Sequence, residues 1–80
     1  MNDVMKFGLS KSQKRVLLAI EKYKAEHGVD MSPTIRELQS LTGYASTSSV
    51  WCILRMLRLK KWIWFLDGVS RSIMISRGEQ

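Results

Sequence analysis

The chain has 80 residues, which is enough for one small domain with a modest core and too few for a second. Thirteen basic residues against seven acidic ones give a net charge of +6, and residues 44–77 hold six of the basic residues and only Asp67 among the acidic ones. A field of that sign and placement suits nucleic acid or an anionic membrane surface. The longest apolar stretch, residues 50–66, is interrupted by four basic residues, which excludes a transmembrane span.

Other classes are excluded by what the sequence lacks. The single cysteine, Cys52, forms no intrachain disulfide, and the N-terminus lacks the layout of a signal peptide, so a cytoplasmic protein is predicted. His27 and Cys52 alone do not make a metal site. There is no Ser/His/Asp set, no suggestive carboxylate pair and no phosphate-binding glycine loop, so we expect no enzyme, cofactor or small-molecule substrate.

The first helix is predicted to begin after Ser10, because Ser10 and Gln13 have the spacing of a capping box, and to end at Gly28. Its apolar stripe comprises Val16, Leu17, Ile20 and Tyr23. Its basic residues are expected to form a solvated face: Lys11, Lys14, Arg15, Lys22 and Lys24.

A second, short helix follows an extended link that ends at Pro33. Thr34 and Glu37 have the spacing of another capping box, and Gly43 closes the helix. Its apolar stripe is Ile35, Leu38 and Leu41.

A third helix begins at a run of four hydroxyl residues, Ser46 to Ser49. Helical spacing turns Val50, Leu54 and Leu57 inward. The residues on the other side are Ser48, Trp51, Cys52, Arg55 and Arg58. Two helices joined by a short turn with a glycine, the second one basic and serine-capped, are typical of a helix-turn-helix.

The last segment predicts a β-hairpin. A two-residue turn at Asp67-Gly68 would pair apolar with hydroxyl residues, whereas a longer loop pairs Phe65 with Ile73 and Ile63 with Ile75. The longer loop is preferred, with residues 69–72 projecting as a wing. It turns three apolar residues outward: Trp62, Trp64 and Met74. The fold expected is mainly α with a small β-hairpin, a winged helix-turn-helix.

The start of the third helix offers free backbone N–H groups, the positive end of the helix dipole and four short side chains: Ser46, Thr47, Ser48 and Ser49. Such groups anchor a DNA phosphate and let the first turn reach base edges. Ser46 taken alone is more simply a cap.

The remaining candidates for DNA contact each have an alternative. Arg55 and Arg58 reach the DNA backbone or form a solvated basic face. Arg71, between serines at the wing tip, enters a minor groove or extends into water. Trp51 stacks on DNA or contacts a protein, and Cys52 is a small residue on the same face.

Four motifs occur in order along the chain: residues 9–13 (Leu-Ser-Lys-Ser-Gln), 32–38 (Ser-Pro-Thr-Ile-Arg-Glu-Leu), 43–50 (Gly-Tyr-Ala-Ser-Thr-Ser-Ser-Val), and the spaced Leu54, Leu57, Lys60 and Ile63. Together they resemble the N-terminal DNA-binding domain of LexA, the SOS-response repressor, over about residues 9 to 76. The resemblance implies a winged helix-turn-helix whose third helix enters the major groove. It places at operator-contacting positions Ser46, Ser48, Ser49 and Cys52.

The chain also departs from that family. It stops where LexA continues into a self-cleaving, dimerising domain, so neither autoproteolysis nor that dimer interface carries over. Lys61 stands where the family usually ends the helix with glycine, and Trp62 and Trp64 replace polar residues. We interpret these changes as those of an independent small regulator, encoded by a phage or mobile element; a fragment of a longer repressor is the alternative.

The sequence therefore predicts a regulator of transcription that binds double-stranded DNA and no membrane. The alternative is a LexA-like module that binds a host repressor or polymerase through its exposed tryptophans. Trp62, Trp64 and Met74 are expected either to make a homodimer through the hairpin or to be covered by the N-terminal arm. The expected boundaries are residues 1–9 for the arm, 10–76 for the domain and 77–80 for a tail.

Overall fold

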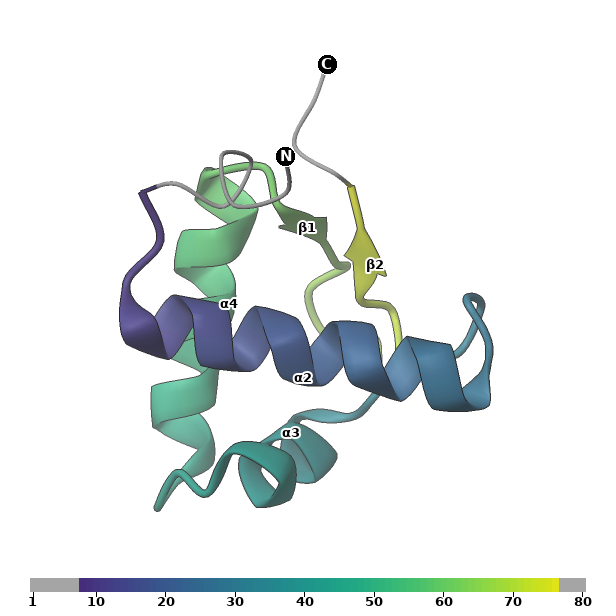
Figure 1. Ribbon diagram of the computed structural model, residues 1–80, viewed down its shortest axis with the longest axis horizontal. Helices are drawn as coiled ribbons and strands as arrows, with labels where there is room; N and C mark the ends of the chain where they lie inside the picture. Colours follow the sequence, from purple (N-terminus) through teal and green to yellow (C-terminus); the bar gives the residue numbers. More distant parts are fainter. Residues whose placement is uncertain (1–7, 77–80) are drawn as a thin grey trace.

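A computed structural model describes residues 8–76 of the chain. Its elements, in order, are helices α2 (Lys11–His27), α3 (Ile35–Thr42) and α4 (Thr47–Leu59) and strands β1 (Ile63–Trp64) and β2 (Met74–Ile75). Three helices followed by a two-stranded antiparallel hairpin confirm the winged helix-turn-helix (Figure 1). Residues 1–7 of the expected arm and the tail 77–80 lie outside the described residues.

Local capping sets the start of each helix. Ser10 and Gln13 exchange hydrogen bonds of 3.1 and 3.2 Å, and Thr34 and Glu37 exchange bonds of 3.1 and 2.9 Å, so both predicted capping boxes are confirmed. Gly43 ends α3 in the left-handed conformation at φ 82°, which glycine adopts at little cost.

The core lies where the three helices and the hairpin meet. Each helix packs against the other two, and α4 also packs against β1 (Figure 1). The buried apolar residues are Leu9, Val16, Leu17, Ile20, Leu38, Val50, Leu54, Leu57, Ile63, Phe65 and Ile73. The predicted inward stripe of α4 is thereby confirmed, whereas Leu41, expected in the stripe of α3, is exposed.

Lys24 is not on a solvated face as expected. Its side chain is buried, and its Nζ donates to the backbone carbonyls of Val29 (3.1 Å) and Met31 (2.9 Å), so it ties the loop after α2 to the helix. Burial lowers the pKa of Lys24, and nearby Asp30 partly offsets that effect.

The end of α4 reverses the chain at Lys61, which has a left-handed φ of 66°. The N–H of Lys61 donates to the carbonyl of Arg58 and the N–H of Trp62 to that of Leu57, each at 3.0 Å. This is the hydrogen-bond pattern of a Schellman motif, in which the residue after the left-handed one packs back on the helix. Trp62 is accordingly half-buried against the core, which corrects the expectation that it faces outward.

The hairpin has the predicted register, with Ile63 opposite Ile75 and Trp64 opposite Met74. Phe65 is buried and Trp64 exposed, as alternation requires. The loop between the strands contains a tight turn, in which the N–H of Val69 donates to the carbonyl of Leu66 (3.2 Å). No helix within residues 8–76 is long and apolar enough to cross a membrane.

Candidate nucleic-acid interface

The outer face of α4 carries the serine-rich opening of the helix. Ser46 is the N-cap, and its hydroxyl accepts from the N–H of Ser49 at 3.4 Å. The side chains of Ser48 and Ser49 are exposed, and that of Thr47 is half-buried. One hydroxyl of the four is therefore used for capping, and two more are free to meet a partner at the positive end of the helix dipole.

Further along α4, the face opens into a hollow of about 630 Å³ between the helix and the wing. This helix–wing groove is lined by Ser48, Trp51, Cys52, Arg55, Arg58, Asp67 and Gly68. Cys52 and Arg55 are exposed, and Arg55 makes no side-chain hydrogen bond or ion pair within residues 8–76. The structure thus brings five of the nine predicted DNA-contacting residues to one groove.

Arg58 is held by the wing. Its Nη1 donates to the backbone carbonyl of Phe65 (3.1 Å) and to the carboxylate of Asp67 (3.2 Å), and its guanidinium lies 4.0 Å from the centre of the Phe65 ring. The side chain is 27% exposed. Arg58 is therefore already paired with a carboxylate of the wing, which the periodicity of α4 did not indicate.

Trp51 was expected on the outer face, and it is instead half-buried, with its ring centre 5.7 Å from that of Phe65. At about 100° per residue, Trp51 and Arg58 lie roughly a quarter turn from the inward line through Val50 and Leu57. That flank of α4 faces the wing. Dividing α4 into one inward and one outward face does not predict this, because the wing packs against a flank between the two faces.

Arg71 was expected to stand free at the wing tip, and that position is wrong. Its Nη1 donates to the hydroxyl of Tyr23 (3.0 Å), the carbonyl of Ser32 (3.0 Å) and Oε1 of Glu37 (3.2 Å). Its Nη2 donates to Oε2 of Glu37 at 3.1 Å. The guanidinium therefore meets the carboxylate through two parallel bonds, the strong bidentate geometry of an arginine–carboxylate pair.

The pKa values of this pair shift as the contacts require. The pKa of Glu37 lies below its usual value, first because the backbone N–H of Thr34 donates to it and second because Arg71 does. The pKa of Arg71 is raised, chiefly by its hydrogen bond to Glu37 and then by that to Tyr23. Both groups are charged over the whole physiological range.

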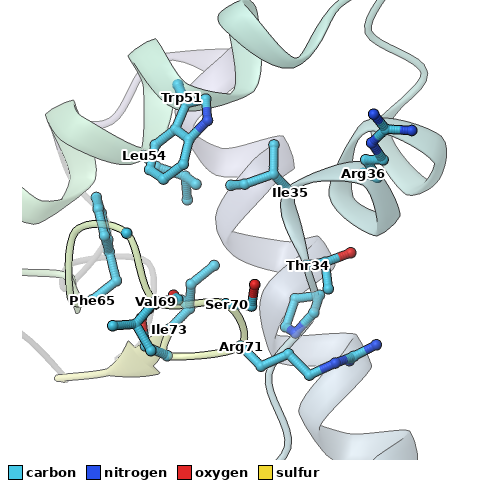
Figure 2. Close-up of a pocket in the computed structure, with 13 residues that line it drawn as sticks. Thr34, Ile35, Arg36, Trp51, Leu54, Phe65, Val69, Ser70, Arg71 and Ile73 are labelled. Carbon is cyan, nitrogen blue, oxygen red and sulfur yellow. Dashed lines mark hydrogen bonds between the residues drawn. The ribbon is translucent and has the colours of Figure 1, made fainter.

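A second hollow, of about 450 Å³, lies between α4, the start of α3 and the wing. Figure 2 shows Trp51 and Ile35 on one side of it and Val69 and Ser70 on the other, with the Arg71 side chain running along its rim. Its floor includes Leu54 and Ile73 of the core. This wing pocket separates the wing loop from α3, so the side chains at its rim decide how closely the two approach.

Trp64 and Met74 face away from the core, as predicted. They are 52% and 59% exposed and stand opposite each other in the hairpin, and Leu66 is 51% exposed. We call these three residues the wing face. Within residues 8–76 no group of three or more histidine, cysteine or acidic side chains could hold a metal ion.

A winged helix-turn-helix with an exposed, serine-capped third helix beside a groove that holds the free Arg55 defines a class of DNA-binding regulatory domain. Comparison with known families makes the assignment specific. The LexA DNA binding domain family matches residues 5–72, and the chain belongs to that family. No curated protein matches the chain.

Proposed function

We propose that this LexA-type domain is a cytoplasmic, sequence-specific regulator that binds double-stranded DNA through α4 and the helix–wing groove. The supporting observation is the exposed outer face of α4, where Ser48 and Ser49 lie at the first turn, Cys52 one turn on and the unpaired Arg55 beyond it. Hydroxyls and helix N–H groups bind phosphates and base edges, and the arginine adds charge.

The basic residues divide into free and engaged groups. Arg58 and Arg71 make the internal contacts described above, and Nζ of Lys60 donates to the carbonyl of Gly8 (2.8 Å) and to Gln13 (2.9 Å). The exposed basic residues without such contacts include Lys11 and Lys14 at the start of α2 and Arg55 on α4. We therefore expect about three to four phosphate contacts.

The salt dependence of binding tests the proposal. With about three to four contacts, the slope of log K against log salt should be about −3 to −4. The measurement is fluorescence anisotropy with genomic fragments that flank the gene for this protein, and with random duplex DNA as control, at several salt concentrations. A flat dependence, or no binding to any duplex at low salt, would contradict a DNA-binding function.

The second candidate function is binding to another protein. The observation that favours it is the wing face, because exposed apolar clusters on a small basic domain mark interaction sites. That surface is smaller than the sequence indicated, since Trp51 and Trp62 are half-buried. A homodimer through the wing face is compatible with DNA binding, because two-fold operators bind two copies.

A further inference from the structure

The bonds of Arg71 connect the wing loop to three segments that lie 34 or more residues earlier in the chain. Tyr23 belongs to α2, Ser32 to the link between α2 and α3, and Glu37 to α3, which is 34 residues from Arg71. A second hydrogen bond joins the same segments nearby: the backbone N–H of Ile73 donates to the buried side-chain hydroxyl of Ser32 at 3.0 Å. The far side of the wing loop is thus fastened to α2 and α3.

Glu37 serves two purposes at once. Its Oε1 accepts from the N–H of Thr34, which completes the capping box, and both carboxylate oxygens accept from Arg71. The guanidinium is therefore fixed relative to the first turn of α3. Because a rigid helix anchors the carboxylate, the wing loop has a defined position where Arg71 joins it.

The near side of the loop is fastened to α4 by Arg58, through Phe65 and Asp67. Asp67 and Gly68 also form the wing border of the helix–wing groove. Loosening the far side would let the loop move across the wing pocket and would change the distance between Gly68 and the outer face of α4. The width of the groove that receives DNA is consequently coupled to the Arg71–Glu37 contact.

We infer that Glu37 and Arg71 are positioning residues for DNA binding: their bidentate contact holds the wing at the distance from α4 that DNA requires. The inference rests on the proposed function. It assigns Arg71 a role through Glu37 and not through a phosphate, and it assigns an acidic residue a favourable role in binding a polyanion.

Whether Glu37→Gln strengthens or weakens DNA binding distinguishes a positioning role from a purely electrostatic one. Glu37→Gln removes a negative charge from a protein of net charge +6, so simple electrostatics predicts equal or tighter DNA binding. Positioning predicts weaker binding. The glutamine side-chain oxygen can still accept from Thr34, so the capping box is retained. The matched control is Glu26→Gln, which removes the same charge from an exposed position in α2.

Affinity is measured by anisotropy for the gene-flanking fragment that the wild-type protein binds most tightly. The temperature is kept well below the melting temperature of each variant, so that a loss of stability alone leaves binding unchanged. Glu37→Gln should weaken binding about three- to tenfold, within the usual range for coupled sites, and Glu26→Gln should leave it unchanged or strengthen it slightly. Arg71→Gln should cause a similar loss with the salt slope unchanged. The double variant should bind DNA about as tightly as whichever single variant binds it less tightly, because both substitutions disrupt the same Arg71–Glu37 contact.

Three results would overturn the inference. One is unchanged or tighter binding by Glu37→Gln; another is additive losses in the double variant. The third is a salt slope that becomes shallower by about 1 in Arg71→Gln, which would mean a direct phosphate contact. Wild-type protein that binds no duplex would overturn the proposed function together with this inference, whereas wild-type binding that Glu37→Gln leaves unchanged or tightens overturns the inference alone.

Amide hydrogen exchange without DNA checks the structural half of the proposal. Glu37→Gln should speed exchange at Ile73 while Ile20 and Leu54 in the core stay protected. Should Glu37→Gln fail to fold, Tyr23→Phe removes one acceptor of Arg71 without a charge change, and it should weaken binding about twofold. Unchanged exchange at Ile73 and unchanged affinity in Tyr23→Phe would each count against the contact as the anchor of the wing.

Discussion

Single residues on the outer face of α4 differ in what they can recognise. Ser48 and Ser49 are short, exposed hydroxyls near the helix start, able to donate to or accept from a base edge. Arg55 is a free cation two turns further on, where a positive charge attracts any phosphate. The serines are thus suited to specificity and the arginine to affinity for DNA in general.

Alanine substitutions separate these contributions. Ser48→Ala or Ser49→Ala should weaken binding to the specific site by about 1 to 3 kcal/mol and leave binding to random duplex nearly unchanged. Arg55→Ala should weaken both alike and make the salt slope shallower by about 1. Anisotropy with both duplexes measures each effect. Equal losses on the two duplexes for all three variants would mean that α4 does not read bases.

At the scale of elements, the end of α4 is one of two places within residues 8–76 where a residue other than glycine takes a left-handed φ; the other is Arg71 at 55°. Lys61 occupies the left-handed position of the Schellman motif at φ 66°, where a side chain costs about 1 kcal/mol or more and glycine costs little. This residue turns the chain from α4 into the wing. The motif forms despite the strain because its two hydrogen bonds and the packing of Trp62 hold it.

Lys61→Gly should therefore raise the free energy of unfolding by about 0.5 to 1 kcal/mol, the relief of strain being partly offset by the greater freedom of glycine in the unfolded chain. Urea denaturation measures the change. Lys61→Ala is the control, because it removes the same charged side chain and keeps the strain. A gain of equal size in both variants would attribute the effect to the side chain and not to the backbone.

Features of the elements that depend on neighbouring residues could be predicted from the sequence. The capping boxes of α2 and α3 follow from a spacing of three residues, and the register of β1 and β2 follows from apolar alternation. Contacts between distant residues could not. The partners of Arg71 lie 34 or more residues away. Lys24 binds carbonyls only a few residues further along the chain, but these belong to the backbone, so no residue type marks them in the sequence.

The candidate site was predicted only in part, for the same reason. Ser48, Ser49, Cys52 and Arg55 are exposed on α4 as helical periodicity indicates, but the wing folds over one flank of that helix. Which residues it covers depends on where the loop returns. Trp51 contacts Phe65 for this reason, a contact that a pattern within one helix does not contain.

For the molecule as a whole, the wing face is an exposed apolar surface outside the core, and it borders the groove at Trp64, whose ring centre lies 6.0 Å from the Arg58 guanidinium. Trp64 and Met74 stand opposite each other across the hairpin, and the exposed Leu66 lies two residues after Trp64. A second copy meeting this surface about a two-fold axis would present the same residues in return. Two domains joined in this way would present two copies of α4 to a two-fold operator.

Replacing Trp64 and Met74 by threonine, which keeps strand propensity, should abolish self-association and cooperative binding to paired half-sites, with the melting temperature nearly unchanged. Sedimentation equilibrium and anisotropy on one or two half-sites measure the two effects. Trp62→Thr is the control: because Trp62 packs against the core, this change should cost about 1 to 3 kcal/mol of stability. A wild-type protein that stays monomeric and binds paired half-sites independently would rule out a dimer through the wing face. A double variant that loses stability as Trp62→Thr does would show instead that these side chains are packed within one chain.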